Sequence, residues 1–262
     1  MGGDSFGYLK PSTDPKSSEK IAEPPPAQSV PSLVILVPGI NAAAEDFDPL
    51  EAEMRDRGYR VARFDYDSTQ SLERSADQFI EMARDLQAKS GLQKIVVIAH
   101  SMGGLVARRA MVQGRKATLA GSFPIELITV AAPFGGFASA DKIPIPWNIF
   151  GIKESHRYLG TSTDFIRSPG SLGPNISHMK IETDERGRTR ILAGETVADS
   201  VAFPENQQNA EVDSDPQVVR RKTIKVGHVA VLCDRGRVPD ELLSVLDDWT
   251  PPLRRESSSA KP

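Results

Sequence analysis

The sequence predicts an α/β fold, in which a mostly parallel open sheet of about six strands carries helices on both faces. Three observations support this fold class: short, continuously apolar segments recur along the chain, amphipathic segments with helical spacing separate them, and glycines mark many of the boundaries. Continuously apolar strands are buried on both faces, and strands that alternate with helices run parallel because each helix returns the chain across the sheet.

The first strand and helix illustrate the pattern. Leu33–Val37 is a run of aliphatic residues and predicts a buried strand. A helix is expected to begin at Asp48, with Asp48 as the N-cap, Pro49 as the first helical residue and Glu51 as the capping-box partner. Gly58 is expected to end this helix, because glycine adopts a positive φ at little cost.

The later elements alternate in the same way. Ser71–Lys89 carries apolar residues every three or four positions, which predicts an amphipathic helix. Further helices are predicted at Met102–Gln113 and Pro239–Trp249. The remaining strands are predicted at Arg60–Phe64, Lys94–Ala99, Glu126–Ala131, Arg188–Ala193 and Lys222–Val226.

The predicted domain, residues 31–250, lies between two tails. Residues 1–30 are rich in proline and poor in apolar residues, so we expect a disordered segment, and residues 251–262 read as a second disordered tail. Residues 133–180 contain many Gly and Pro residues and no clear helix. A long loop within a compact domain is usually functional, which predicts a lid-like insertion, with a plain surface excursion as the alternative.

Composition excludes several classes of protein. The 32 Lys and Arg residues nearly balance the 35 Asp and Glu residues, so no charge excess directs the chain to nucleic acid or to an anionic membrane. The longest apolar runs have five residues, whereas a transmembrane helix needs about 20. Cys233 is the only cysteine, which excludes an internal disulfide and argues against a zinc site. No cofactor motif is present, so no cofactor is expected. The N-terminus lacks the basic and apolar regions of a signal peptide, so we expect a cytoplasmic protein, with a secreted form that has lost its leader as the alternative.

Ser101 lies between a predicted strand and a predicted helix, in the segment Ala99-His100-Ser101-Met102-Gly103. This is a variant of the G-x-S-x-G nucleophile elbow, with Ala99 at the first glycine position. A serine in this turn has a strained backbone that exposes Oγ, and the residues two positions away must be small. The Met102 N–H would lie at a helix N-terminus, which stabilises an anion. The sequence therefore predicts Ser101 as a nucleophile and Met102 as an oxyanion-hole donor, in preference to an ordinary strand–helix turn.

A second loop, Pro38-Gly39-Ile40-Asn41, also joins a predicted strand to a helix. Acyl transfer needs another backbone N–H opposite Met102 to bind the developing oxyanion. Gly39 allows a close approach of the backbone, so the amide of Ile40 is the first candidate and that of Asn41 the second. A simple Pro-Gly turn is the alternative.

These segments resemble α/β-hydrolases of the lipase and esterase kind, and in particular small bacterial triacylglycerol lipases. The resemblance covers about Ser32 to Trp249. The sequence departs from the family pattern at Pro38 and at Phe134, where the family usually has histidine, which leaves the subfamily and the substrate open. Four segments carry the resemblance, in the family's order: Pro38–Ile40, Ala99–Gly104, Ala131–Gly136 and Val226–Val229.

The resemblance implies a catalytic triad in the chain order Ser, acid, His. His228 follows a predicted strand and precedes the last helix, where the family has its catalytic base. His100 is next to Ser101 in the chain, so we expect its side chain to point away from Oγ. Asp199 in Asp199-Ser200-Val201 resembles the acid of the family, and Glu195 is the second candidate.

Two other acidic residues, Asp213 and Asp215, are expected to be solvated in a loop. Phe134, in the turn after the fourth predicted strand, and Trp147, in the insertion, are predicted to bind substrate. The charged pair Arg108 and Arg109 is expected on a solvated helix face or in an ion pair.

The resemblance implies hydrolysis of a carboxylic ester of a small molecule or lipid through an acyl-enzyme, without a metal or cofactor. The same triad could serve a thioesterase, an amidase or an acyltransferase. A non-catalytic binding protein with this fold is the less favoured alternative, because all three triad candidates are present. The sequence does not predict an oligomeric state.

Overall fold

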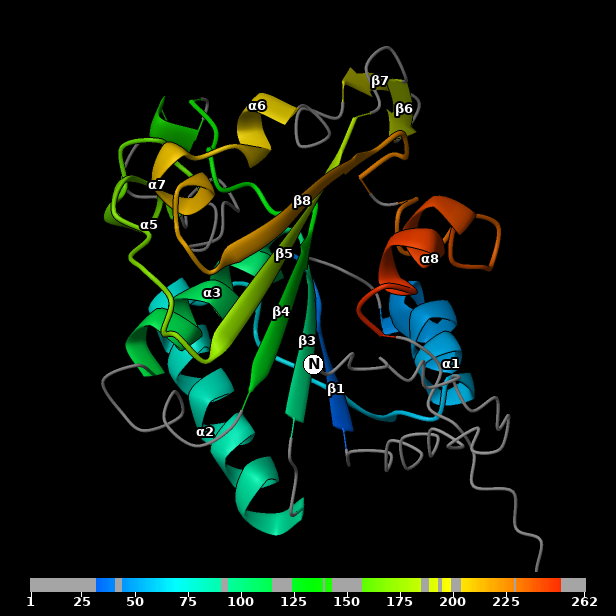
Figure 1. The fold of residues 1–262 in the computed structure, drawn as a ribbon. Helices are drawn as coiled ribbons and strands as arrows, with labels where there is room; N and C mark the ends of the chain where they lie inside the picture. Colours follow the sequence, from blue (N-terminus) through cyan, green and yellow to red (C-terminus); the bar gives the residue numbers. More distant parts are fainter. Residues whose placement is uncertain are drawn as a thin grey trace, which may run out of the picture.

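The computed structural model describes residues 32–40, 44–90, 94–114, 124–138, 140–142, 157–184, 189–192, 195–198, 204–228 and 230–250. Both predicted tails lie outside this part of the chain. Its main sheet has six strands in the order β2-β1-β3-β4-β5-β8, and every neighbouring pair is parallel (Figure 1). The strands are β1 (Ser32–Val37), β2 (Arg60–Arg63), β3 (Lys94–His100), β4 (Ile125–Val130), β5 (Ile176–Thr183) and β8 (Val218–Ile224).

Helices cover both faces of this sheet, as predicted. The longer ones are α1 (Asp48–Asp56), α2 (Leu72–Ser90), α3 (Met102–Gly114) and α8 (Asp240–Leu246). In Figure 1, α2 and α3 lie on one side of the sheet, and α1 and α8 lie on the other. Among the described residues, no helix combines the length and the apolar character that crossing a membrane requires. The short helices are η1 (Ala44–Phe47), η3 (Ala140–Lys142), α5 (Asp164–Arg167), α6 (Pro204–Gln207) and α7 (Ala210–Asp213).

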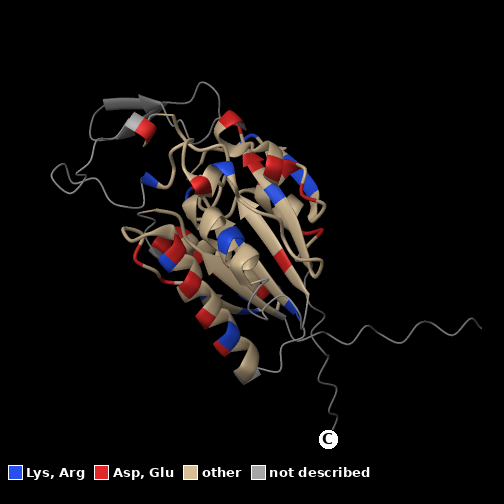
Figure 2. Ribbon diagram, turned by 90° about the vertical axis from the view of Figure 1, so that its left-hand side faces the viewer, with Lys and Arg blue, Asp and Glu red and all other residues tan. Residues whose placement is uncertain are grey.

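Two apolar layers sandwich the sheet, because successive side chains of a strand point to opposite faces. Ile35 and Val97 pack with α2 and α3 in one layer. Val34 and Val96 pack with α1 and α8 in the other. In Figure 2, acidic and basic residues lie on both helices and strands, but Lys94 and Glu126 are the charged residues of the central strands β1, β3 and β4. Burial on both faces explains why β1, β3 and β4 are mostly aliphatic.

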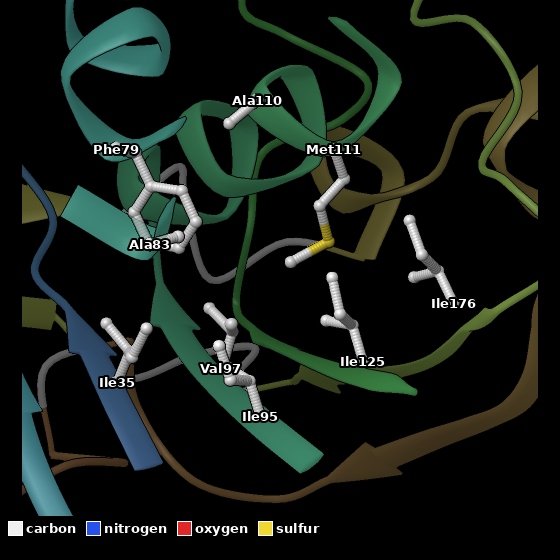
Figure 3. A pocket seen from close by; sticks show the side chains of 9 residues that line it. All are labelled: Ile35, Phe79, Ala83, Ile95, Val97, Ala110, Met111, Ile125 and Ile176. Carbon is white, nitrogen blue, oxygen red and sulfur yellow. The ribbon is translucent and has the colours of Figure 1, made fainter. Parts of the chain in front are cut away.

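A small apolar cavity lies between the sheet and the pair α2 and α3 (Figure 3). Nine side chains line it, among them Val97 of β3 and Ala110 and Met111 of α3. We expect Val97→Ile to place one more methyl group in this space and to raise the free energy of unfolding by about 0.8 kcal/mol.

The neighbouring Val96 provides a matched control, because it is fully buried in the opposite layer. Val96 lines neither this cavity nor the one beside Arg108, so the same substitution there should cost about 1–3 kcal/mol through overpacking. Urea unfolding of both variants measures the difference. Equal effects of the two substitutions would contradict a cavity on the Val97 side.

The prediction of a strand at Arg188–Ala193 is confirmed, but its place as the fifth strand of the main sheet was wrong. This region forms β6 (Thr189–Leu192), which pairs antiparallel with β7 (Glu195–Ala198) in a separate two-stranded sheet. The fifth strand of the main sheet is β5, whose first residues fall inside the range 133–180 predicted as a lid. Polar residues alternate along β5, so it lacks the continuous apolar run by which the other buried strands were recognised.

The predicted cap of α1 also needs correction. Asp48 is the first helical residue, and the N-cap position, Phe47, makes no side-chain cap hydrogen bond. Glu51 pairs with Arg55 and Arg63 rather than acting as a capping-box residue. Asp48 also pairs with Arg63, so these carboxylates fasten α1 to β2. Gly58 does adopt the predicted positive φ, at 93°.

Candidate active site

Ser101 occupies a sharp turn between β3, which ends at His100, and α3, which begins at Met102. Its φ is 54°, in a region that residues other than glycine seldom adopt. The Ser101 N–H donates to the carbonyl of Val130 at 2.9 Å, and the Ser101 carbonyl accepts from the Gly104 N–H at 2.9 Å. These bonds hold the strained backbone in the predicted elbow.

The small residues of the elbow allow three chain segments to meet. A Cβ on Gly103 would lie 2.3 Å from the carbonyl oxygen of Pro38, and a Cβ on Gly104 would lie 2.5 Å from Cβ of Ala132. The first turn of α3 therefore packs directly on the loop after β1 and on the turn after β4. Larger side chains would push the nucleophile away from both.

The loop that contains the predicted oxyanion donor lies beside Ser101. A Cβ on Gly39 would come within 2.8 Å of Cβ of Ser101. Tyr66 donates its hydroxyl hydrogen to the Pro38 carbonyl at 2.9 Å and so fastens this loop. Burial raises the pKa of Tyr66 well above its ordinary value, so the hydroxyl keeps its proton. Ile40 follows directly, while Asn41 lies outside the described residues.

His228 lies in the loop after β8, and it is the predicted base that the structure brings to Ser101. Its Nε2 is 3.0 Å from Ser101 Oγ, although the two residues are 127 positions apart in the chain. Both side chains are buried, with relative exposures of 8% and 6%. This distance suits proton transfer from a nucleophilic hydroxyl to an imidazole.

His100, the residue before Ser101, contacts the backbone and the ring of His228. Its Nε2 lies 2.7 Å from the backbone carbonyl oxygen of His228. The two imidazole rings are 4.7 Å apart between centroids.

Four other residues that the sequence predicts for the site are not placed beside Ser101 by the described part of the structure. Asp199 and Trp147 lie outside the described residues, and for Glu195 only the backbone, in β7, is described. Phe134 is 2% exposed and meets the ring of His178 edge-on at 6.0 Å, so it lies in the core. Its contact with a substrate stays a prediction.

Asp184 is a candidate that the sequence analysis missed. It follows β5 directly, and its N–H donates to the carbonyl of Ile224 at 2.9 Å. Ile224 ends β8, four residues before His228, so a carboxylate stands at the same sheet edge as the base loop. Recognition of β5 as a sheet strand would have identified it, because catalytic residues gather at the carboxyl ends of parallel strands.

A buried ion pair lies behind the elbow helix. Arg108 of α3 and Asp215 have side-chain exposures of 2% and 1% and pair at 2.7 Å. Arg108 also donates to the Gly170 carbonyl, and Asp215 accepts from the Leu172 N–H. The expectation of a solvated Asp215 was wrong, because its partner Arg108 is 107 residues away in the chain.

A second buried group of charges surrounds β5. Lys180 pairs with Glu182 at 2.9 Å and with Asp213, whose carboxylate is mostly buried rather than solvated as predicted. Burial, together with the charges of Arg108 and Lys180, lowers the pKa of His178 well below its ordinary value. Neutral His178 bonds to the hydroxyl of Thr129 at 2.8 Å and takes no part in the site.

Asp141 fastens two segments that flank residues 143–156. Its carboxylate accepts hydrogen bonds from the backbone N–H groups of Thr161 and Ser162, both at 3.0 Å, and from their hydroxyls. The Ser162 and Thr161 hydroxyls contribute most to lowering the pKa of Asp141 from 3.8 to about 2.

The depressed pKa predicts a pH dependence for this carboxylate clamp. A lower pKa in the folded state means that the clamp is fully present above about pH 3.8 and is lost as the pH falls through about 2. At pH 6, Asp141→Asn should lower the hydrogen-exchange protection of the Thr161 and Ser162 amides. Near pH 2, where about half of the wild-type carboxylate is protonated, the difference from wild type should be smaller. Asp164→Asn is the control and should change neither amide. A difference as large near pH 2 as at pH 6 would contradict the assignment.

Several solved structures share this fold. The chain is similar to the mature Bacillus licheniformis lipase BlEst2, with a sequence identity of 17% and a TM-score of 0.59. The match covers 87% of this chain and 94% of that chain. It is also similar to the metagenomic carboxyl esterase MGS0156, with 14% identity, 88% and 79% covered, and a TM-score of 0.57. At these identities the likeness concerns the fold.

One curated protein is related in sequence. Lecithin-cholesterol acyltransferase-like 4 of Arabidopsis thaliana is 32% identical over an alignment of 134 positions, and the match covers 48% of this chain. The match spans only 24% of the length of that relative. Residues 34–257 match the family described as the alpha/beta hydrolase family, and this chain belongs to that family.

Proposed function

We propose that this protein is a serine hydrolase that cleaves carboxylic esters through a covalent acyl-enzyme. The observation that carries the proposal is the buried contact of 3.0 Å between His228 Nε2 and Ser101 Oγ on a strained strand–helix turn. The family membership and the fold shared with a lipase and an esterase support it.

In the proposed acylation step, Ser101 donates its proton to Nε2 of His228 while Oγ attacks the acyl carbonyl carbon. Nε2 must then be the acceptor nitrogen of a neutral imidazole, with the proton on Nδ1. The oxyanion of the tetrahedral intermediate accepts hydrogen bonds from the N–H groups of Met102 and Ile40. His228 returns its proton to the ester oxygen, the C–O bond breaks, and an alcohol leaves.

Deacylation repeats these steps with water. His228 removes a proton from water, whose oxygen attacks the acyl carbon bound to Ser101. The second tetrahedral intermediate collapses, the carboxylic acid leaves, and Ser101 regains its proton from His228. These steps need neither a metal nor a cofactor.

An acidic side chain would hold the Nδ1 proton of His228 and stabilise the imidazolium. The family resemblance indicates Asp199 for this role. The position of Asp184 directly after β5 favours Asp184 instead. Only one carboxylate can accept the hydrogen bond from Nδ1, so we expect one of Asp184→Asn and Asp199→Asn to lose about 10⁴-fold in kcat while the other retains most activity. Losses below about tenfold in both variants would contradict a triad built on either residue.

A panel of activated esters of graded acyl length, with a matched thioester and a matched anilide, tests the reaction class. We expect the highest kcat/KM for an oxygen ester. A preference for the thioester or the anilide would contradict the ester proposal while leaving the Ser101–His228 pair intact.

The name of the acyltransferase-like relative favours one second candidate, in which an alcohol replaces water in deacylation. Adding an acceptor alcohol to the ester assay would then yield a new ester in place of the free acid.

A further inference from the structure

His100 lies at the point where three parts of the site meet. It is the last residue of β3, directly before Ser101, and it is 5% exposed. Its ring packs against the ring of His228 at 4.7 Å and meets Phe47 of η1 edge-on at 6.4 Å. A Cβ on Gly39 would lie 3.4 Å from His100 Nδ1, so the ring also borders the loop that contains Ile40.

The hydrogen bond from this ring acts on the backbone of His228. Nε2 of His100 lies 2.7 Å from the His228 carbonyl oxygen. A carbonyl oxygen only accepts hydrogen bonds, so Nε2 carries a proton and donates. The bond joins the end of β3 to the loop after β8, across 128 positions of the chain.

His228 itself lies in a turn rather than in a helix or strand. A turn gives its side chain less support than a regular element, yet a shift of about 1 Å at a catalytic group can lower the rate by about 10²-fold. A bond to the carbonyl of the same residue fixes the position from which the imidazole projects toward Ser101 Oγ.

We propose that His100 is a positioning residue that holds His228 in register with Ser101. The inference rests on the proposed function, because it assigns His228 as the base. His100 does not touch the reacting atoms, and it acts through the backbone of the residue that does.

Two substitutions at His100 separate the hydrogen bond from packing. His100→Phe keeps an aromatic ring and removes the donor, and it should lower kcat on an ester by about 10²-fold with little change in KM. His100→Gln offers an amide N–H in place of Nε2 and should recover most of the lost kcat. A donor to a buried carbonyl also contributes to stability, so urea unfolding is measured for both variants.

His178→Phe is the matched control. His178 is another fully buried histidine with one short side-chain hydrogen bond, to Thr129, and it lies outside the proposed machinery. Its loss should lower the free energy of unfolding while the folded variant keeps its kcat.

The kinetics of wild type and these three variants decide the question. A low kcat for His100→Phe, recovery in His100→Gln and a normal kcat for His178→Phe would support the proposal. Wild-type kcat in folded His100→Phe, or equal losses in the His100→Phe, His100→Gln and His178→Phe variants, would overturn it and leave the proposed function standing.

Should His100→Phe fail to fold, a wild-type kcat in His100→Gln supports the proposal, and a kcat as low as about 1% of wild type in that variant overturns it. A wild-type protein that hydrolyses no ester would overturn the proposed function, and this inference with it.

Discussion

Ser101→Ala is expected to lower kcat for ester hydrolysis by about 10⁴-fold or more, with a smaller change in KM. The variant loses the oxygen that forms the acyl-enzyme, so only the oxyanion donors and substrate binding can still accelerate the reaction. His228→Ala should cause a loss of similar size, because nucleophile and base act as a unit. Steady-state kinetics on the best ester of the panel measures both.

Ser75→Ala provides the matched control for this experiment. Ser75 is a buried serine of α2, and its hydroxyl donates to the carbonyl of Ser71 rather than to any site residue. This variant should keep wild-type kcat and KM. Ester hydrolysis at more than a few per cent of the wild-type rate by Ser101→Ala would exclude the proposed mechanism.

Arg108→Met is expected to cause the largest loss of stability, about 3–5 kcal/mol in the free energy of unfolding. The substitution removes the partner of Asp215 and leaves a carboxylate in the interior without its guanidinium. Hydrogen bonds from Gln217, Leu172 and Arg108 outweigh burial and keep the pKa of Asp215 below its ordinary value, so the group is charged at neutral pH. Urea unfolding at pH 7 measures the loss.

Two further variants test this explanation. The more exposed pair Arg55–Glu51 of α1 also joins an arginine to a carboxylate, and Arg55→Met should cost less than about 1 kcal/mol. Adding Asp215→Leu to Arg108→Met removes the stranded charge and should restore most of the lost stability. A cost for Arg108→Met no larger than that for Arg55→Met would show that burial of the pair does not matter.

Burial on both faces made most of the fold predictable from sequence. β1, β3 and β4 are mostly aliphatic because both of their faces are covered, and Gly58 marked the end of α1. The strand that escaped recognition, β5, buries His178, Lys180 and Glu182. Their partners lie on α3, on α7 and on β8, up to 70 residues away in the chain. The local sequence therefore does not show that these buried polar groups have hydrogen-bonding or charged partners.

The predictability of the candidate site also depended on whether its features are local in the sequence. The elbow was predictable because its requirements are local: a buried strand, a serine and small residues on either side. His228 was predictable only through its order in the family pattern, since nothing local links it to a serine 127 positions away. Asp184 stayed hidden because the strand before it was read as part of an insertion.

Intact mass after treatment with a fluorophosphonate tests the central claim most directly. The reagent phosphonylates an activated serine with loss of fluoride, so wild type should gain one adduct and Ser101→Ala none. An adduct that persists in Ser101→Ala would contradict the assignment of the nucleophile. A folded wild-type protein that stays unlabelled, both with and without detergent, would contradict the account of a Ser101 activated by His228.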